Sequence, residues 1–139
     1  YNGDMLEGMA MFADDSFDCV ILSQTLQQTE KPAVVISEML RVGRRAIISF
    51  PNFGQFSIRL NLLATGRMPV TKRLPYTWYG TPNIHMLTVK DFRALCREKG
   101  LRIVDTTFLT RTDRHVPAPF ANLLATTAIF VLESGPSQE

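Results

Sequence analysis

The sequence predicts an α/β fold, a doubly wound and mostly parallel sheet whose final strand runs antiparallel to the others. Residues 17–51 lead to this prediction, because an apolar strand, a polar loop, an amphipathic helix and a second apolar strand follow one another as in a βαβ unit. A further helix at 89–99 precedes two strand patterns, at 101–109 and 126–133. The last strand is expected to return as the antiparallel partner of the one before it.

The first strand of the βαβ unit, Phe17–Leu22, is a nearly continuous apolar run. Such a run is typical of a strand buried on both faces of a parallel sheet. Before it, residues 5–12 have roughly helical apolar spacing and predict a short helix, and Asp14–Ser16 predicts a turn.

The helix of this unit is expected to begin at Pro32, a residue that a first helical turn tolerates, with Thr29 as its N-cap. Four apolar residues between positions 35 and 40 recur at helical spacing and predict the face turned toward the core. Gly43 is expected just beyond the C-terminus of the helix, and Ala46–Phe50 is the returning strand.

Residues 52–88 are too long for a plain connection and too aromatic for a disordered linker. Residues 56–64 predict a short helix that ends near Gly66, and three prolines and several aromatic residues follow. Such an insertion is typical of a substrate lid or a partner surface. The alternative, a loop that covers the sheet edge and buries its own aromatic side chains, stays open at this point.

The remaining elements follow local signals. Thr88 and Asp91 have the spacing of a capping box at the start of helix 89–99, and Gly100 is expected to end it. Strand 101–109 alternates apolar and polar residues, residues 110–121 predict a polar loop, and strand 126–133 closes the sheet.

Composition excludes several classes of function. The chain has 139 residues and a net charge of +2, which is too small to indicate binding to nucleic acid or to a membrane surface. The apolar stretch 116–132 contains two prolines and an asparagine, so it is not expected to span a membrane. Cys19 and Cys96 fall in a predicted strand and a predicted helix, and buried reduced thiols at both positions favour a cytoplasmic protein.

Two loops are candidate ligand-binding segments, Ser23–Gln28 and Pro51–Gln55. In open α/β sheets, ligands bind beyond the carboxyl ends of the strands, where both loops are expected to lie. No grouping of Ser, His and Asp, no paired carboxylates and no metal-spaced ligands stand out, so no metal site is predicted.

Four segments carry a resemblance to a known family: FDCVILSQTLQ at 17–27, EMLRVGRRAIISFPNFG at 38–54, GRMPVTKRLPYTWY at 66–79 and TPNIH at 81–85. Together they resemble the family of the methionine biosynthesis protein MetW, whose fold is that of class I S-adenosylmethionine-dependent methyltransferases. The resemblance implies a role in methionine biosynthesis beside a homoserine O-acyltransferase. It also implies that residues 1–133 are the C-terminal portion of one methyltransferase-like domain, with 52–88 as an insertion and 134–139 as a tail.

The resemblance implies S-adenosylmethionine as the cofactor and names residues near it. By resemblance, Asp4 and the backbone of Met5 lie near the adenine, and Ser23, Gln24 and Leu26 line the methionine moiety. Serine and glutamine offer hydrogen-bond donors and acceptors, and leucine offers an apolar contact.

The chain departs from the family pattern at its start. The glycine-rich turn after the first strand of a methyltransferase, and the acidic residue that takes the ribose hydroxyls, are both missing. We therefore expect the chain to be part of a longer protein, to bind the cofactor poorly by itself, and to expose an apolar edge at Phe17–Leu22.

Catalysis has only weak candidates. His85 is the candidate base near the expected mouth of the site, with Tyr76 and Tyr79 before it in the insertion, although a histidine hydrogen-bonded within the insertion is the favoured explanation of His85. Two functions remain open: a binding subunit that acts with or regulates the acyltransferase, and an active methyltransferase for an unidentified small molecule.

Overall fold

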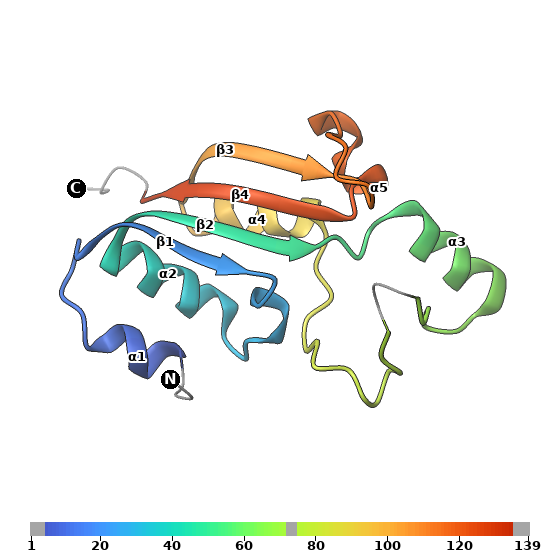
Figure 1. Ribbon diagram of the computed structural model, residues 1–139, viewed down its shortest axis with the longest axis horizontal. Helices are drawn as coiled ribbons and strands as arrows, with labels where there is room; N and C mark the ends of the chain where they lie inside the picture. Colours follow the sequence, from blue (N-terminus) through green and yellow to red (C-terminus); the bar gives the residue numbers. More distant parts are fainter. Residues whose placement is uncertain (1–4, 72–74, 135–139) are drawn as a thin grey trace.

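The computed structural model of the chain describes residues 5–71 and 75–134. Four strands in these residues form one sheet in the order β1-β2-β4-β3, with helices packed beneath it (Figure 1). In chain order the elements are α1 (Met5–Ala10), β1 (Phe17–Ser23), η1 (Leu26–Gln28), α2 (Pro32–Val42), β2 (Gly43–Pro51), α3 (Phe56–Thr65), α4 (Val89–Glu98), β3 (Arg102–Leu109), η2 (Ala118–Phe120), α5 (Ala121–Leu124) and β4 (Thr127–Glu133).

The strand directions confirm the predicted fold class. β1 pairs with β2 in parallel, and β4 lies between β2 and β3 and runs antiparallel to both. β1, β2 and β3 therefore run in one direction, and their carboxyl ends lie at the same edge of the sheet, next to α3 and α5 (Figure 1). This is the edge at which the sequence predicts a ligand site.

The core lies between one face of the sheet and the helices α2 and α4. On β4, buried residues alternate with partly exposed ones, so only one face of this strand is covered. Phe50, Phe92 and Phe130 form the centre of the core, with ring centroids 4.7–5.8 Å apart. Such aromatic pairs add about 0.5–1.5 kcal/mol each beyond the area that they bury.

The other face of the sheet and the outer edge of β1 are open in the part of the chain that the structure describes. Ile21 is 68% exposed, and Phe17 and Val104 are also exposed. The prediction that Phe17–Leu22 is buried on both faces is therefore wrong for this chain, because helices pack on one face only. The expected apolar edge at this strand is confirmed.

The two cysteines differ in how far they are buried. Cys96 is buried in α4 as predicted, and its burial raises the pKa of the thiol to about 11. Cys19 is exposed on β1, so the prediction of a buried thiol there is wrong. Both cysteines are free.

One of the two predictions at the ends of α2 is wrong. The N-cap is Lys31, without a capping hydrogen bond from its side chain, whereas the Thr29 hydroxyl donates to the Leu26 carbonyl in the preceding turn (2.9 Å). Gly43 lies directly after the last residue of the helix, as predicted, and it begins β2 in an extended conformation. A Cβ atom at Gly43 would lie 2.5 Å from Cγ2 of Val20, so close packing against β1 explains the glycine.

The local signals of the later helices are confirmed. α3 ends at Gly66, which adopts a left-handed conformation (φ 63°), and the capping box of Thr88 and Asp91 begins α4. The loop expected at 110–121 is partly helical, because η2 and the first residue of α5 fall within it. No helix in the described ranges is both long enough and apolar enough to pass through a membrane.

One ion-pair cluster ties three strands together at the amino end of β2. Glu133 on β4 accepts hydrogen bonds from Arg45 on β2 (2.7 Å) and from Arg102 on β3. These two bonds, that from Arg45 first, lower the pKa of the Glu133 carboxyl. A carboxyl whose pKa is lowered on folding contributes stability above its unfolded pKa, and this contribution is lost as the pH falls through the folded pKa.

We predict that Glu133→Gln lowers the free energy of unfolding of the natural protein at neutral pH. The difference from the wild type should shrink as the pH falls below the ordinary glutamate pKa of about 4.3. Chemical denaturation at a series of pH values measures it, with Glu98→Gln, which removes an exposed carboxylate from α4, as the matched control. A difference that stays constant down to acid pH would contradict the ion-pair account.

Candidate functional site

The carboxyl ends of β1 and β2 are joined by a small polar network. The Gln24 amide donates to the Ser49 carbonyl (2.9 Å) and lies 3.2 Å from the Ser49 hydroxyl, and the Ser23 hydroxyl lies 3.3 Å from the same hydroxyl. Gln24 has a left-handed backbone (φ 52°), which is uncommon for a residue with a side chain. The loop after β1 therefore turns sharply and presents Ser23 and Gln24 at the edge of the sheet.

Gln27 connects this loop to the segment before α4. Its carbonyl accepts the amides of Ile84 (2.8 Å) and His85 (3.0 Å), and its side-chain nitrogen donates to the Gln24 carbonyl (2.8 Å). Gln27 is 4% exposed, and its side-chain oxygen has no hydrogen-bond partner within residues 5–71 and 75–134. The end of the insertion is thus fixed directly against the candidate loop after β1.

Asn52, the first residue after β2, organises the other half of the edge. It is 2% exposed, and its side-chain nitrogen lies within hydrogen-bond distance of the carbonyls of Ala121, Asn122 and Ala125, at 3.3, 3.1 and 2.8 Å. Its side-chain oxygen accepts the Gly54 amide at 3.1 Å and lies 3.4 Å from the Val89 amide. One side chain therefore holds together the end of β2, the start of α4 and the helix α5.

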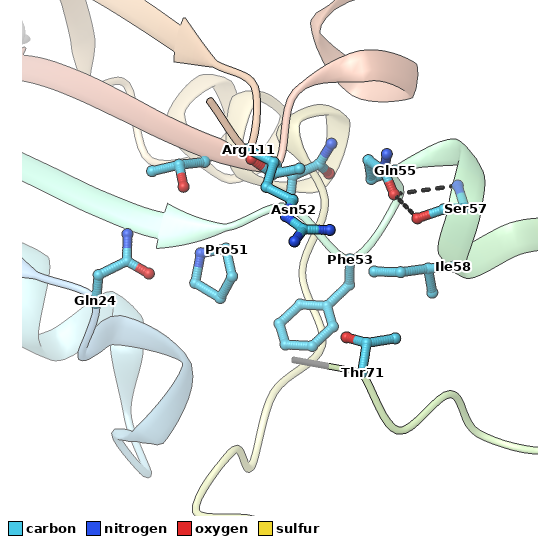
Figure 2. A pocket seen from close by; sticks show the side chains of 11 residues that line it. Gln24, Pro51, Asn52, Phe53, Gln55, Ser57, Ile58, Thr71 and Arg111 are labelled. Atoms are coloured by element: carbon cyan, nitrogen blue, oxygen red, sulfur yellow. Dashed lines mark hydrogen bonds between the residues drawn. The ribbon is translucent and has the colours of Figure 1, made fainter. Parts of the chain in front are cut away.

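A cavity of about 540 Å³ opens at this edge (Figure 2). It lies between the carboxyl end of β2, the start of α3 and the loop after β3, and Figure 2 shows Arg111 reaching across it from that loop. Small-molecule sites generally have volumes of roughly 300–1,000 Å³. Its lining residues are Gln24, Pro51, Asn52, Phe53, Gln55, Ser57, Ile58, Thr71, Arg111, Thr126 and Thr127.

The cofactor candidates lie in different surroundings. Ser23 is exposed at the end of β1, and Gln24 lies beside it and lines the cavity. Leu26 is 2% exposed and belongs to the hydrophobic core, so its side chain is turned away from solvent. Met5 is partly buried against the core at the start of α1, and Asp4 lies outside the described residues.

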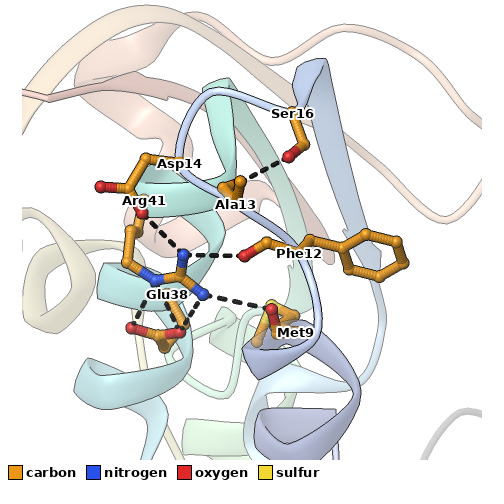
Figure 3. Close-up of polar contacts among 7 residues, drawn as sticks. All are labelled: Met9, Phe12, Ala13, Asp14, Ser16, Glu38 and Arg41. Atoms are coloured by element: carbon orange, nitrogen blue, oxygen red, sulfur yellow. Dashed lines mark hydrogen bonds and ion pairs between the residues drawn. The ribbon is translucent and has the colours of Figure 1, made fainter.

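A half-buried arginine holds α1, the helix that carries Met5, in place (Figure 3). The Arg41 guanidinium pairs with Glu38 (2.8 Å) and Asp14 (2.7 Å), and it donates to the carbonyls of Met9 and Phe12. The hydrogen bond to Glu38, and then that to Asp14, raises the pKa of Arg41 above its ordinary value. The segment between α1 and β1 is therefore anchored on α2.

The candidate catalytic residues do not gather at the cavity. Tyr76 is 50% exposed and lines a separate apolar groove of about 290 Å³, and Tyr79 is 76% exposed. The Nε2 atom of His85 is buried and has no hydrogen-bond partner among the residues that the structure describes, and His85 does not line the cavity. No role was predicted for Asn52 or Arg111 from the sequence. Asn52 lies in the predicted ligand-binding segment 51–55, whereas no sequence motif around Arg111 indicates a functional residue.

Comparison with known proteins relates most of the chain to one family. Residues 1–132 match the family model described as methionine biosynthesis protein MetW. The chain is 39% identical over 129 residues to the bifunctional methionine biosynthesis protein MetXA/MetW of Rhodopirellula baltica. That alignment covers 91% of this chain and 21% of the relative, so the chain spans about a fifth of the relative's length.

Solved structures show the fold. An S-adenosylmethionine-dependent methyltransferase from Archaeoglobus fulgidus superposes with a TM-score of 0.62 at 12% identity, covering 96% of this chain and 66% of that one. A possible histamine N-methyltransferase from Thermotoga maritima gives a TM-score of 0.58 at 12% identity, covering 88% and 57%. The predicted methyltransferase-like fold is confirmed.

We predict that Asn52→Ala lowers the free energy of unfolding of the natural protein by about 3 kcal/mol, because it leaves buried carbonyl and amide groups without partners. Denaturant unfolding measures the change. Asn61→Ala, on the exposed face of α3, is the matched control. A loss below about 1 kcal/mol for Asn52→Ala would contradict its organising role.

Proposed function

Because this chain belongs to the family of the methionine biosynthesis protein MetW, we propose that it is a binding subunit that docks on a homoserine O-acyltransferase and regulates it. The observation that carries this proposal is the apolar surface of the insertion. The proposal has two parts, a partner surface on the insertion and a cofactor loop after β1.

The insertion leaves many large apolar side chains exposed. Trp78 and Tyr79 are 75% and 76% exposed, with their rings 5.5 Å apart in an edge-to-face arrangement. None of the residues of α3 is buried, and Leu63 is 83% exposed. We call the exposed apolar residues of this region the insertion surface: Phe56, Leu60, Leu62, Leu63, Met68, Val70, Tyr76, Trp78, Tyr79, Ile84 and Met86.

Such a surface is characteristic of a protein interface. Contiguous apolar patches on soluble proteins mark sites of interaction, and tryptophan and tyrosine are enriched among the residues that contribute most to binding. A groove of about 290 Å³ lies beside Trp78 and is lined by Phe53, Leu62 and Tyr76 among others. It offers a recess into which a partner side chain would fit.

The identity of the partner is supported by the relative from Rhodopirellula baltica, which carries the names MetXA and MetW in one bifunctional protein. The resemblance found in the sequence likewise pairs MetW proteins with a homoserine O-acyltransferase. Two functions joined in one chain work beside each other at high effective concentration. An interface between separate chains would serve the same purpose.

The cofactor proposed for the loop after β1 is S-adenosylmethionine, the cofactor of the methyltransferases that share this fold. The loop provides chemistry that suits an amino-acid group: the Ser23 hydroxyl, the Gln24 carboxamide and the exposed end of a parallel strand. Bound there, the cofactor would supply a transferable methyl group. Asp4 and Met5 stay proposed for the adenine by resemblance alone.

Methyl transfer is the less favoured function. Removing a proton from an acceptor requires a base within reach of it. The described residues that line the cavity include no histidine and no carboxylate, and the side chain of His85 is turned into the protein. A cofactor held without a base suits a sensing role better than catalysis.

We predict that Trp78→Ala combined with Tyr79→Ala weakens binding to the homoserine O-acyltransferase by roughly 30-fold or more, since exposed aromatic anchors contribute about 1–2 kcal/mol or more each. Calorimetry or biolayer interferometry on the natural protein measures it. Phe120→Ala removes an exposed aromatic residue outside the insertion and is the control that should bind as the wild type.

The same preparations should melt at the wild-type temperature, because neither exposed ring contributes to the core. Unchanged acyltransferase binding by the folded double variant would contradict the proposed surface. Binding that is lost equally in the Phe120→Ala control would contradict it as well.

A further inference from the structure

We propose that Gln27 couples the loop after β1 to the insertion surface, so that a cofactor bound at the loop strengthens docking of the acyltransferase. This inference rests on the proposed function and adds its regulation, because it links the two binding events through one buried residue. The hydrogen bonds of Gln27, its burial and the backbone conformation of Gln24 carry it.

Gln27 is a buried polar residue at the edge of the hydrophobic core. It is 4% exposed and follows Leu26, which belongs to the core. The nitrogen of its carboxamide donates to the Gln24 carbonyl (2.8 Å), whereas the oxygen has no partner in the described part of the chain. A buried polar atom without a partner destabilises a fold and calls for an explanation. The contacts of Gln27 on two sides support a functional link as that explanation.

The first half of the link joins Gln27 to the residue proposed to contact the cofactor. Gln24 has a left-handed backbone (φ 52°), a conformation that a residue with a side chain keeps where its surroundings hold it. The Gln24 amide donates to the Ser49 carbonyl (2.9 Å), and the Gln24 carbonyl accepts the bond from Gln27. Strained residues of this kind cluster at ligand clamps and switch regions. A cofactor that contacts Gln24 therefore acts on Gln27 through one hydrogen bond.

The second half of the link joins Gln27 to the end of the insertion. The Gln27 carbonyl accepts the backbone amides of Ile84 (2.8 Å) and His85 (3.0 Å). Residues 83–87 belong to neither a helix nor a strand, so hydrogen bonds to neighbouring segments determine where they lie. Gln27 therefore positions this stretch of chain as well as the loop after β1.

This stretch carries part of the insertion surface. Ile84 and Met86 are 57% and 51% exposed, and Met86 also lines the groove beside Trp78. A ligand that orders the loop after β1 also orders these side chains, because Gln27 holds both segments. Docking of the partner then costs less conformational entropy. The coupling is therefore positive, and each ligand raises the affinity for the other by the same factor.

Hydrogen exchange of the natural protein tests the link without the partner. In the wild type, S-adenosylhomocysteine should slow exchange of the Ile84 and His85 amides at least about fivefold. In the free protein, Gln27→Met should speed exchange of both amides at least about fivefold, since it removes the bond to the Gln24 carbonyl. Gln28→Met makes the same change at the exposed neighbour and should exchange as the wild type.

Two outcomes of this experiment would overturn the proposal. One is binding of S-adenosylhomocysteine to the wild type without slower exchange at Ile84 and His85, a measurement that needs no variant. The other is exchange at these amides that is the same in Gln27→Met and Gln28→Met.

Binding of the acyltransferase then measures the coupling itself. S-adenosylhomocysteine should tighten acyltransferase binding to the wild type at least about fivefold. This factor should fall to about one in Gln27→Met and keep its wild-type value in Gln28→Met. An acyltransferase affinity that S-adenosylhomocysteine leaves unchanged or lowers, or a factor retained in Gln27→Met, would overturn the proposal. If the wild type does not bind the acyltransferase, the proposed function fails, whereas the exchange rates still decide whether Gln27 links the two segments.

Discussion

The placement of β4 between β2 and β3 is the constraint on which the site depends. Thr127, the first residue of β4, pairs with Pro51 at the end of β2 and with Leu109 at the end of β3. The backbone continues this line, since the Asn52 amide donates to the Thr126 carbonyl (3.0 Å) and the Thr126 amide donates to the Leu109 carbonyl (2.9 Å). Two parallel strands that are not direct neighbours are thereby brought to the same level, and the loops that leave them enclose the cavity.

The groove beside Trp78 and the cavity share a wall. Phe53 and Ile58 line both the cavity with Arg111 and the groove with Trp78, and they belong to the segment that joins β2 to α3. α3 itself has no buried residue, so it does little to hold this segment. The segment is held by the hydrogen bonds of Asn52 and by the hydrogen bond that the Phe53 amide donates to the Leu87 carbonyl (3.1 Å). This methyltransferase-like fold thus carries its candidate ligand edge and its candidate partner surface on one short stretch of chain.

Features that depend on a local sequence pattern are predictable from the sequence. Features that depend on contacts between segments distant in the chain are not. The βαβ unit, the end of α3 at Gly66 and the capping box of Thr88 and Asp91 were predictable, because spacing and backbone preference determine them. The exposure of Cys19 was not, because burial depends on what covers a strand. The position of Arg111 at the cavity was not predictable for a similar reason. The register of β4 brings the loop that carries Arg111 to Pro51, and no sequence motif around Arg111 indicates this proximity.

We propose that the edge formed by the ends of β1 and β2 is a cofactor site in a regulatory subunit. Titration of S-adenosylhomocysteine into the natural protein by calorimetry tests it most directly, because this molecule keeps the amino-acid and adenosine groups of the cofactor without its transferable methyl. The account predicts saturable binding at one site, weakened when Gln24 is replaced by Ala. If the titration gives no binding heat, and S-adenosylmethionine does not compete with S-adenosylhomocysteine for the protein, the proposed cofactor site is contradicted. The insertion surface would then be left as the functional part of the chain.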